Sequence, residues 1–258
     1  MNRPKRLVIV SDLHCGHQMG LTPPKFRERI NKDKRDMSKK LWDFIAKEVD
    51  AIRPIDILLC NGDALNGKSG GFWGDGTFTK DRFQQVNIAE EALRFFDAKD
   101  YLFTYGTPCH VGDEAEDWEE PIAARFKGSI RAQQEFQINK TVFHAKHYIQ
   151  GSGIPHGRFT GIARERLWGT LWAEYGERKK AHVTIRSHVH SYSLCRGFGW
   201  TGFTTPALEA WDTKHGQRNL SGTSDFGFLS MDIKDGPGEF DIREHITHGI
   251  LKADSVKF

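Results

Sequence analysis

Histidine and aspartate side chains recur in this sequence where short apolar runs come to an end. The set that could bind metal ions comprises Asp12, His14, Asp63, His110, His147, His188 and His190. Imidazole and carboxylate ligands without thiolates suit Mn, Fe, Zn or Co, and the lack of a cysteine cluster argues against a structural zinc site. The remaining histidines, among them His17, have no partner motif and are interpreted as surface or packing residues. The sequence therefore predicts a metal centre, in which a carboxylate such as Asp63 could bridge two ions.

Buried strands should deliver these ligands. Leu7–Ser11 is apolar or small throughout, which predicts a strand buried on both faces, and Ile55–Cys60 repeats the pattern before Asp63. Asp12 and His14 are two residues apart, so in an extended chain their side chains would point to one side and converge on one cation. Because open α/β sheets bind ligands beyond the carboxyl ends of their strands, we expect the motifs to meet there.

Apolar residues repeat at helical spacing in three further stretches. These are Met37–Val49, Val86–Phe96 and Trp168–Tyr175. We interpret the aromatic residues of the third stretch as core or packing residues rather than as a base-stacking platform. Other strands are predicted at Tyr101–Tyr105, at Val183–Arg186, as antiparallel strands within Ile130–Ile149, and as a closing pair within Phe226–His245.

Length, charge and cysteine content limit the class of protein that the chain can form. A chain of 258 residues can form one α/β domain, and we expect a single domain over residues 1–258. The formal net charge of +3 and the pI of about 8.6 fall short of the basic excess that by itself indicates a nucleic-acid partner. The four cysteines form no CxxC pair, which disfavours a disulfide framework and favours a cytoplasmic location. No segment approaches the ~18 apolar residues of a membrane span, so we expect no membrane partner.

Five motifs follow one another along the chain. They are SDLH from Ser11, NGD from Asn61, YGTPCH from Tyr105, KH from Lys146 and SHVH from Ser187. Together they resemble the ordered motif set DxH, GDxxx, GNH(D/E), a lone His and GHxH of the calcineurin-like metallophosphoesterase superfamily, over roughly residues 7 to 250. The variant GTPxH, together with DLHCG, is similar to phage or prophage members of that superfamily.

This resemblance implies a four-layer α/β/β/α sandwich of two mixed sheets flanked by helices. It also implies a phosphoesterase with two divalent metal ions, of which we favour Mn. The residues carried over as ligands are Asp12, His14 and His190 for one ion, His147 and His188 for the other, and Asp63 as the bridge. A hydroxide bridging the ions would attack a phosphoester, with a phosphodiester favoured over a monoester. The expected partner is therefore a phosphoester substrate, a class that includes nucleotides and nucleic-acid ends.

The third motif departs from the family pattern. Thr107 stands where the family has the Asn that binds the second metal, and His110 follows three residues after Thr107, later than the His of the family pattern. We expect His110 to act as general acid or phosphate contact, or else to complete the second metal site, which could also depend on Asp113. The predicted catalytic residues are thus His110 and Asp63, and the candidate substrate contacts are Thr107, Lys68 and Arg158.

Two other functions remain open alternatives. Gly62–Ser69, GDALNGKS, satisfies the P-loop pattern GxxxxGK(S/T) after a predicted strand, which would make the chain a nucleotide triphosphatase. The glycines that follow Ser69 disfavour the helix that a P-loop must open, and Asp63 would place a carboxylate in the phosphate cradle. A metal-stabilised binding module without turnover is the second alternative, because Thr107 replaces a ligand.

Overall fold

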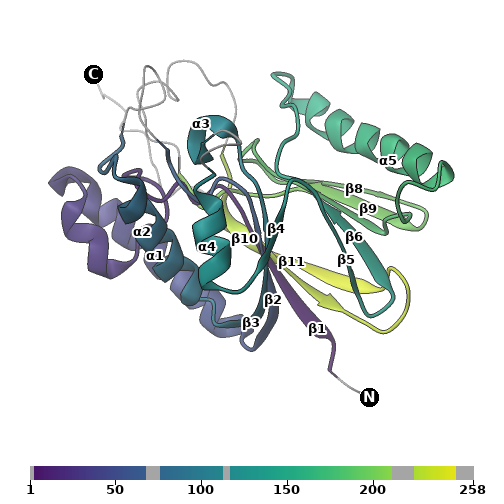
Figure 1. The fold of residues 1–258 in the computed structure, drawn as a ribbon, viewed down its shortest axis with the longest axis horizontal. Helices are drawn as coiled ribbons and strands as arrows, with labels where there is room; N and C mark the ends of the chain where they lie inside the picture. Colours follow the sequence, from purple (N-terminus) through teal and green to yellow (C-terminus); the bar gives the residue numbers. More distant parts are fainter. Residues whose placement is uncertain (1–2, 68–75, 113–116, 211–223, 248–258) are drawn as a thin grey trace, which may run out of the picture.

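Two β-sheets face each other across an apolar core, and helices cover the outer face of each sheet (Figure 1). The computed structural model describes residues 3–67, 76–112, 117–210 and 224–247 of the chain. In Figure 1 the layers run from α1 and α2 on one side, through the two sheets, to α5 on the other. The predicted four-layer sandwich of two mixed sheets is confirmed.

The first sheet has six strands in the order β11-β10-β1-β2-β3-β4. Their bounds are β1 Lys5–Val10, β2 Ile55–Asn61, β3 Ala98–Thr104, β4 Ser129–Arg131, β10 Phe226–Ile233 and β11 Phe240–Thr247. Strands β1 to β4 are parallel to one another, whereas β10 pairs antiparallel with both β1 and β11. The parallel arrangement brings the carboxyl ends of β1, β2 and β3 to one edge of the sheet.

The second sheet has five strands in the order β5-β6-β7-β9-β8. Their bounds are β5 Gln134–Ile138, β6 Thr141–Ala145, β7 Val183–Arg186, β8 Ser193–Gly197 and β9 Trp200–Thr204. Strand β7 is parallel to β6 and β9, and the pairs β5–β6 and β8–β9 are antiparallel. The antiparallel pair predicted within Ile130–Ile149 is confirmed as β5 and β6, while β4 joins the first sheet instead.

The helices divide between the two outer faces. They are α1 Arg35–Ile52, α2 Arg82–Arg94, α3 Pro108–Val111, α4 Glu119–Arg125 and α5 Arg158–Glu174, with short 3-10 turns at Pro24–Arg29, Lys32–Lys34 and Pro155–Gly157. In α1 the side chains of Leu41, Ile45 and Val49 are buried, so the predicted amphipathic pattern is confirmed. Helix α2 begins where the Asp81 carboxylate accepts hydrogen bonds from the backbone N–H groups of Phe83 and Gln84.

The alternation of side chains along β1 explains why the first sheet is buried on both faces. Val8 and Val10 belong to the core beneath α1 and α2, whereas Leu7 and Ile9 belong to the core between the sheets. All four side chains are fully buried. The apolar run thus specifies a central strand because each face of the sheet meets a different apolar layer.

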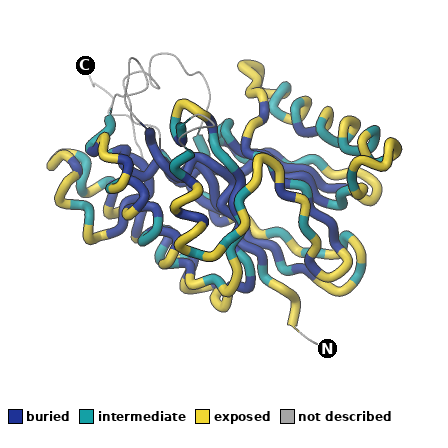
Figure 2. Tube along the Cα trace, in the orientation of Figure 1, coloured by how far each residue is buried: buried dark blue, intermediate teal, exposed yellow. Residues whose placement is uncertain are grey.

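Helix α5 is the exception to the predicted core. Its only buried residue is Ile162. The aromatic residues expected in the core are instead 53% (Trp168), 42% (Trp172) and 74% (Tyr175) exposed. Figure 2 shows that most of α5 is exposed or intermediate. The interpretation of these residues as core is therefore wrong, because helical spacing identifies a common face without saying whether that face is covered.

Two findings bear on the expected environment. Within the described residues, no helix combines the length and the apolar content needed to cross a bilayer. All four cysteines are free thiols, and Cys15 and Cys60 are buried.

Candidate metal centre

The predicted ligands lie in loops immediately after β1, β2, β6 and β7. Five of them adopt positive φ angles: Asp12 (52°), His14 (44°), Asp63 (52°), His188 (73°) and His190 (51°). This left-handed region disfavours residues with a side chain, so its repeated use at one place indicates a functional constraint. Extended geometry, which the sequence reasoning assumed for the two-residue spacings, is therefore wrong. The side chains converge because the backbone turns sharply after each strand.

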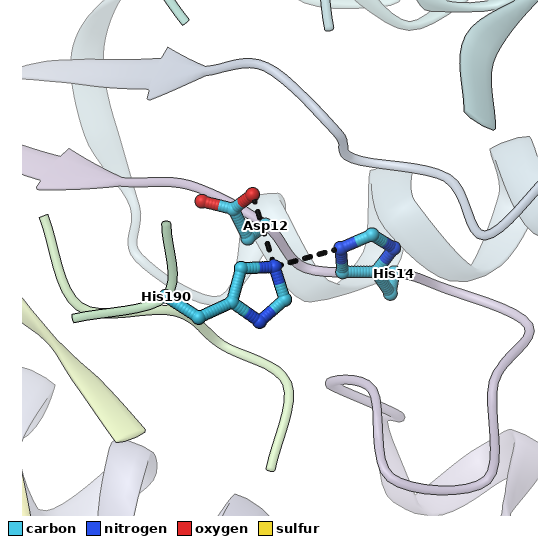
Figure 3. A group of neighbouring side chains, drawn as sticks. All are labelled: Asp12, His14 and His190. Atoms are coloured by element: carbon cyan, nitrogen blue, oxygen red, sulfur yellow. Dashed lines mark hydrogen bonds and ion pairs between the residues drawn. The ribbon is translucent and has the colours of Figure 1, made fainter. Parts of the chain in front are cut away.

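Asp12, His14 and His190 form the first group of candidate ligands (Figure 3). The Nε2 atom of His190 lies 3.3 Å from Asp12 Oδ1 and 3.3 Å from His14 Nε2. Asp12 is fully buried and His14 is 3% exposed. The first sheet supplies two of these residues and the second sheet supplies the third, so the group forms only where the sheets meet.

Asp63, His147 and His188 form the second group. The Nε2 atom of His147 lies 3.0 Å from Asp63 Oδ2, and the His147 and His188 rings are nearly perpendicular at 5.5 Å between centroids. The Nδ1 atom of His147 donates a hydrogen bond to the carbonyl oxygen of Asn61 at 2.7 Å. This bond commits Nδ1 as a donor and leaves Nε2, next to Asp63, as the nitrogen that can exchange its proton for a metal ion.

A third group, which overlaps the others, links Asp63 to His14 and His110. The Nδ1 atom of His110 donates to the carbonyl oxygen of Asn66 at 2.9 Å, and its ring meets the edge of His14 at 4.5 Å between centroids. The first two groups are also close to each other, because His147 Nε2 lies 3.9 Å from Asp12 Oδ1. Asp63 therefore occupies the position between the two histidine sets.

Several buried polar atoms at this centre lack an aligned hydrogen bond within the described part of the chain. They are Asp12 Oδ1, His14 Nδ1 and His147 Nε2. Burying such atoms without a partner is costly, yet two of them lie within 4 Å of another candidate ligand atom. Lone pairs that point to a common centre rather than to each other are expected of metal ligands. The donor set, oxygen and imidazole nitrogen, fits divalent transition ions.

At this centre, burial and the neighbouring charges shift the pKa values of the side chains in opposite directions. Burial would raise the pKa of Asp63, but the positive charge of the adjacent His147 lowers that pKa below its ordinary value. Burial would lower the pKa of His147, but Asp63 and Asp12 raise it to about 10. Burial lowers the pKa of His14 to about 4, although Glu209 opposes the shift. Two buried carboxylates thus draw positive charge to the centre, which a metal cation can supply in place of a proton.

Thr107 contacts Asp63. Its hydroxyl lies 3.0 Å and 2.9 Å from the two carboxylate oxygens of Asp63, and its backbone N–H donates to Oδ1 at 2.6 Å. Thr107 is 9% exposed. The residue that replaces the family's Asn therefore holds the shared carboxylate in place.

Glu119 supports the same region from α4 and was missed by the sequence reasoning. Its carboxyl group is 1% exposed and accepts hydrogen bonds from the backbone N–H groups of Ala64 at 2.8 Å and Gly106 at 2.6 Å. It thereby joins the loop after β2 to the loop after β3. Burial, followed by the charge of Asp63, raises the pKa of Glu119 to about 8.

Glu209 was missed as well, and it lies beside the first group. Its Oε1 atom is 2.7 Å from His17 Nδ1, and its Oε2 atom is 3.7 Å from both His14 Nε2 and His190 Nδ1. His17 is 3% exposed, so of the two predicted environments, surface or packing, it has the second, and it packs beside the first group. A carboxylate beside ligand imidazoles orients the rings and increases their basicity.

A set of side-chain hydrogen bonds joins the two sheets next to the ligand loops. The Thr104 hydroxyl donates to Asn61 Oδ1 at 2.9 Å, and Asn61 Nδ2 donates to Ser187 Oγ at 2.6 Å. The Thr205 hydroxyl donates to Ser187 Oγ and lies 2.7 Å from Ser11 Oγ. We call these five residues the inter-sheet chain. It connects the ends of β1, β2 and β3 with the ends of β7 and β9.

The remaining predicted residues lie elsewhere. Lys68 and Asp113 are outside the described residues, and Arg158 is the first residue of α5. The described part of the P-loop pattern, residues 62–67, is not helical, and Asp63 within it lies against His147. The P-loop alternative is therefore disfavoured, because a carboxylate committed to a histidine cluster cannot line a phosphate cradle.

Comparisons with known proteins found similar folds among solved structures. No family model and no curated protein matches the chain. Among solved structures, Vps29 from Entamoeba histolytica complexed with Zn²⁺ is 11% identical, with a TM-score of 0.44 and coverage of 93% of this chain and 98% of that one. A predicted phosphoesterase from Streptococcus pneumoniae is 11% identical, with a TM-score of 0.43 and coverage of 95% and 91%. An archaeal phosphodiesterase is 12% identical, with a TM-score of 0.44 and coverage of 93% and 99%.

The layers and the positions of the motifs define the class of fold. Two mixed sheets lie between helical layers, and the residues of all five motifs meet at the strand ends that border both sheets. This is the arrangement that the resemblance to the calcineurin-like metallophosphoesterases implied, and the chain has that fold.

Proposed function

We propose that this protein is a metal-dependent phosphoesterase that hydrolyses a phosphodiester in preference to a monoester. The observation that carries the proposal is the convergence of two carboxylate and histidine groups on either side of Asp63. A structural metal site would need one closed set of ligands, whereas this centre has three overlapping sets, two of which share Asp63 and two of which share His14.

The ligand assignment combines the groups in the structure with the family resemblance. Asp12, His14 and His190 would hold one ion, and His147, His188 and Asp63 would hold the other. Asp63 also groups with His14, and we assign it as the bridge that the resemblance implies. Two such ions, when bound, lower the pKa of water near neutrality and offset negative charge on the phosphoryl oxygens. Mn²⁺ is the ion that we favour, since oxygen and imidazole donors suit it.

His110 is proposed as the proton donor to the leaving oxygen. Its Nδ1 atom is anchored on the carbonyl oxygen of Asn66, so Nε2 is the atom that can face a substrate. Burial would lower the pKa of His110, but the hydrogen bond with Cys109 and the charge of Asp63 raise it to about 10. In the metal-free protein these interactions favour the imidazolium form, which is the form that a general acid needs.

Hydrolysis of two model esters tests the proposal. Chelator-treated protein would be assayed with bis-p-nitrophenyl phosphate and p-nitrophenyl phosphate, with and without added Mn²⁺. We expect turnover only with the metal, a preference for the diester, and loss of turnover in Asp63→Asn. Asp100→Asn, an exposed carboxylate on β3, is the matched control and should keep wild-type turnover. Turnover that persists in Asp63→Asn, or without metal, would contradict the two-ion proposal.

A metal-stabilised binding module is the second candidate function. The observation that favours it is that Thr107 bonds to Asp63 where the family pattern has a ligand for the second ion. In that case folded protein would bind Mn²⁺ by calorimetry and cleave neither ester. A metal stoichiometry of one, together with no turnover, would select this candidate.

A further inference from the structure

Helix α5 and its carboxyl end carry a row of large aromatic side chains that are partly exposed. Trp168, Trp172 and Tyr175 follow one another at intervals of four and three residues and are 53%, 42% and 74% exposed. On a helix these intervals place the rings on one face, about 6 Å and 4.5 Å apart along the axis. We propose that this row, which we call the α5 platform, binds single-stranded nucleic acid and directs it to the candidate metal centre. Binding of the strand does not depend on the proposed function. Only its cleavage at the metal centre rests on that proposed function.

The packing of α5 against the second sheet does not account for these exposed rings. Its contact with the second sheet rests on Ile162, which packs with Ile149 and Trp200, and on an ion pair between Glu165 and the buried Arg186. The helix is thus attached to the sheet through the Ile162 cluster and this ion pair, and the three large aromatic rings take no part in either. An exposed aromatic row on such a helix indicates a surface for binding.

Basic side chains accompany the platform. Residues 158–180 contain six lysines and arginines against three glutamates, and one of those glutamates is paired with Arg186. Arg164 is exposed one helical turn before Trp168, and the Arg178 guanidinium lies 5.7 Å from the centre of the Trp172 ring. Lys179 and Lys180 extend the basic character beyond the helix. A whole-chain charge of +3 concealed this local excess, which complements a phosphate backbone.

The amino end of α5 lies next to the candidate metal centre. Ile162, in the first turns of α5, forms a cluster with Ile149 and Trp200, and Val189, between the candidate ligands His188 and His190, packs against that cluster. Tyr148 is 50% exposed, and its ring lies 4.9 Å from that of His188. A strand lying along α5 would therefore reach the ligand loops at the amino end of the helix (Figure 1).

Ring spacing and area favour a single strand over a second protein. Stacked bases are about 3.4 Å apart in duplex DNA, so ring intervals of about 4.5–6 Å suit a strand that is more extended than a duplex. Aromatic faces stack bases of any sequence, which makes such a row a binding site without sequence preference. A helix of 17 residues offers roughly 26 Å by 10 Å, about a third of the ~800 Å² per partner in a stable dimer. The platform alone is thus too small to hold two copies together.

Fluorescence anisotropy tests the platform directly. Full-length protein in excess chelator, which prevents cleavage, would be titrated into a fluorescein-labelled single-stranded oligonucleotide of about 20 nucleotides. We expect the double substitution Trp168→Ala/Trp172→Ala to weaken binding at least tenfold, and wild-type affinity to fall steeply with added salt. Phe83→Ala is the matched control, because Phe83 is 66% exposed on α2 in the opposite helical layer. It should change the affinity less than twofold.

Two further measurements, on Asp63→Asn and on the oligomeric state, distinguish failure of the binding proposal from failure of the proposed function. Asp63→Asn should bind the oligonucleotide like the wild type while losing ester turnover, so a failure of the proposed function leaves the binding result intact. Unchanged binding in the double variant, or no binding by the wild type, would overturn the platform. Analytical ultracentrifugation of the wild type and the double variant measures the oligomeric state. A wild-type dimer that becomes monomeric in the double variant would identify a second copy as the occupant and would also overturn the proposal.

Discussion

Glu119 offers a test of how the loops around Asp63 are held in place. Its two carboxyl oxygens accept hydrogen bonds from the backbone N–H groups of Ala64 and Gly106, and the side chain is 1% exposed. In Glu119→Gln one N–H keeps an oxygen acceptor, whereas the other faces an amide NH₂ group. A buried backbone donor without a partner costs about 1–3 kcal/mol. Because domains are stable by about 5–15 kcal/mol, the variant should remain folded with a measurable loss.

The pH dependence of stability should change as well. Burial, followed by the charge of Asp63, raises the pKa of Glu119 from 4.5 to about 8 in the folded protein. Between these values the folded state holds a proton that the unfolded chain releases, so the free energy of unfolding falls as pH rises. The slope is at most about 1.4 kcal/mol per pH unit. This contribution is complete below the unfolded pKa and is lost as pH rises through the folded value.

Urea unfolding in chelator, followed from about pH 5 to about pH 8, measures both effects. We expect Glu119→Gln to be less stable than the wild type near pH 5 and to lose stability less steeply as pH rises. Glu120→Gln, its exposed neighbour, is the control and should match the wild type in both respects. If Glu119→Gln shows wild-type stability and the wild-type slope, the reasoning about this carboxyl group is refuted.

Two other substitutions test contacts at the candidate metal centre. Glu209→Gln should weaken Mn²⁺ binding by about 10–100-fold in calorimetry, because Glu209 lies beside the His14 and His190 imidazoles; unchanged affinity would show that it does not support them. Thr107→Val removes the hydroxyl next to Asp63 and should lower the free energy of unfolding in chelator by about 1.5–3 kcal/mol. A change below about 0.5 kcal/mol would show that the backbone N–H of residue 107 is sufficient.

The sequence was sufficient to place the candidate ligands at strand ends. Apolar runs such as Leu7–Val10 identify buried strands, and parallel strands present their carboxyl ends at one edge. The local geometry was beyond sequence reasoning. Asp12 and His14 converge through positive φ angles rather than through an extended chain. The types of these residues do not predict the left-handed conformation, because the surrounding fold imposes it.

The supporting carboxyl groups could not be predicted because their partners are far away in sequence. Glu119 bonds to Ala64, 55 residues earlier, and Glu209 lies against His14 and His17 near the start of the chain. Neither glutamate follows an apolar run or stands in a recognisable motif. Only the folded structure shows that Glu119 is buried near Asp63 and that Glu209, 13% exposed, lies beside His14.

Helix α5 shows where periodicity is informative and where it is not. The spacing of Trp168, Leu171, Trp172 and Tyr175 correctly predicted a helix. It predicted the wrong environment, because the side that contacts the sheet carries Ile162 and Glu165 instead. An aromatic face is usually covered, so the exception itself is informative about function.

The inter-sheet chain has a consequence for the order of events during folding. Ser11 and Thr205, which lie 2.7 Å apart, are 194 residues apart in sequence, and His14 and His190 are separated by 176. Contacts at such separation form after local helices and hairpins, since long loops must close first. The ligands therefore come together only when the two sheets dock, near the end of folding. During synthesis on the ribosome, the emerging chain can assemble this centre only after most of its length has left the exit tunnel.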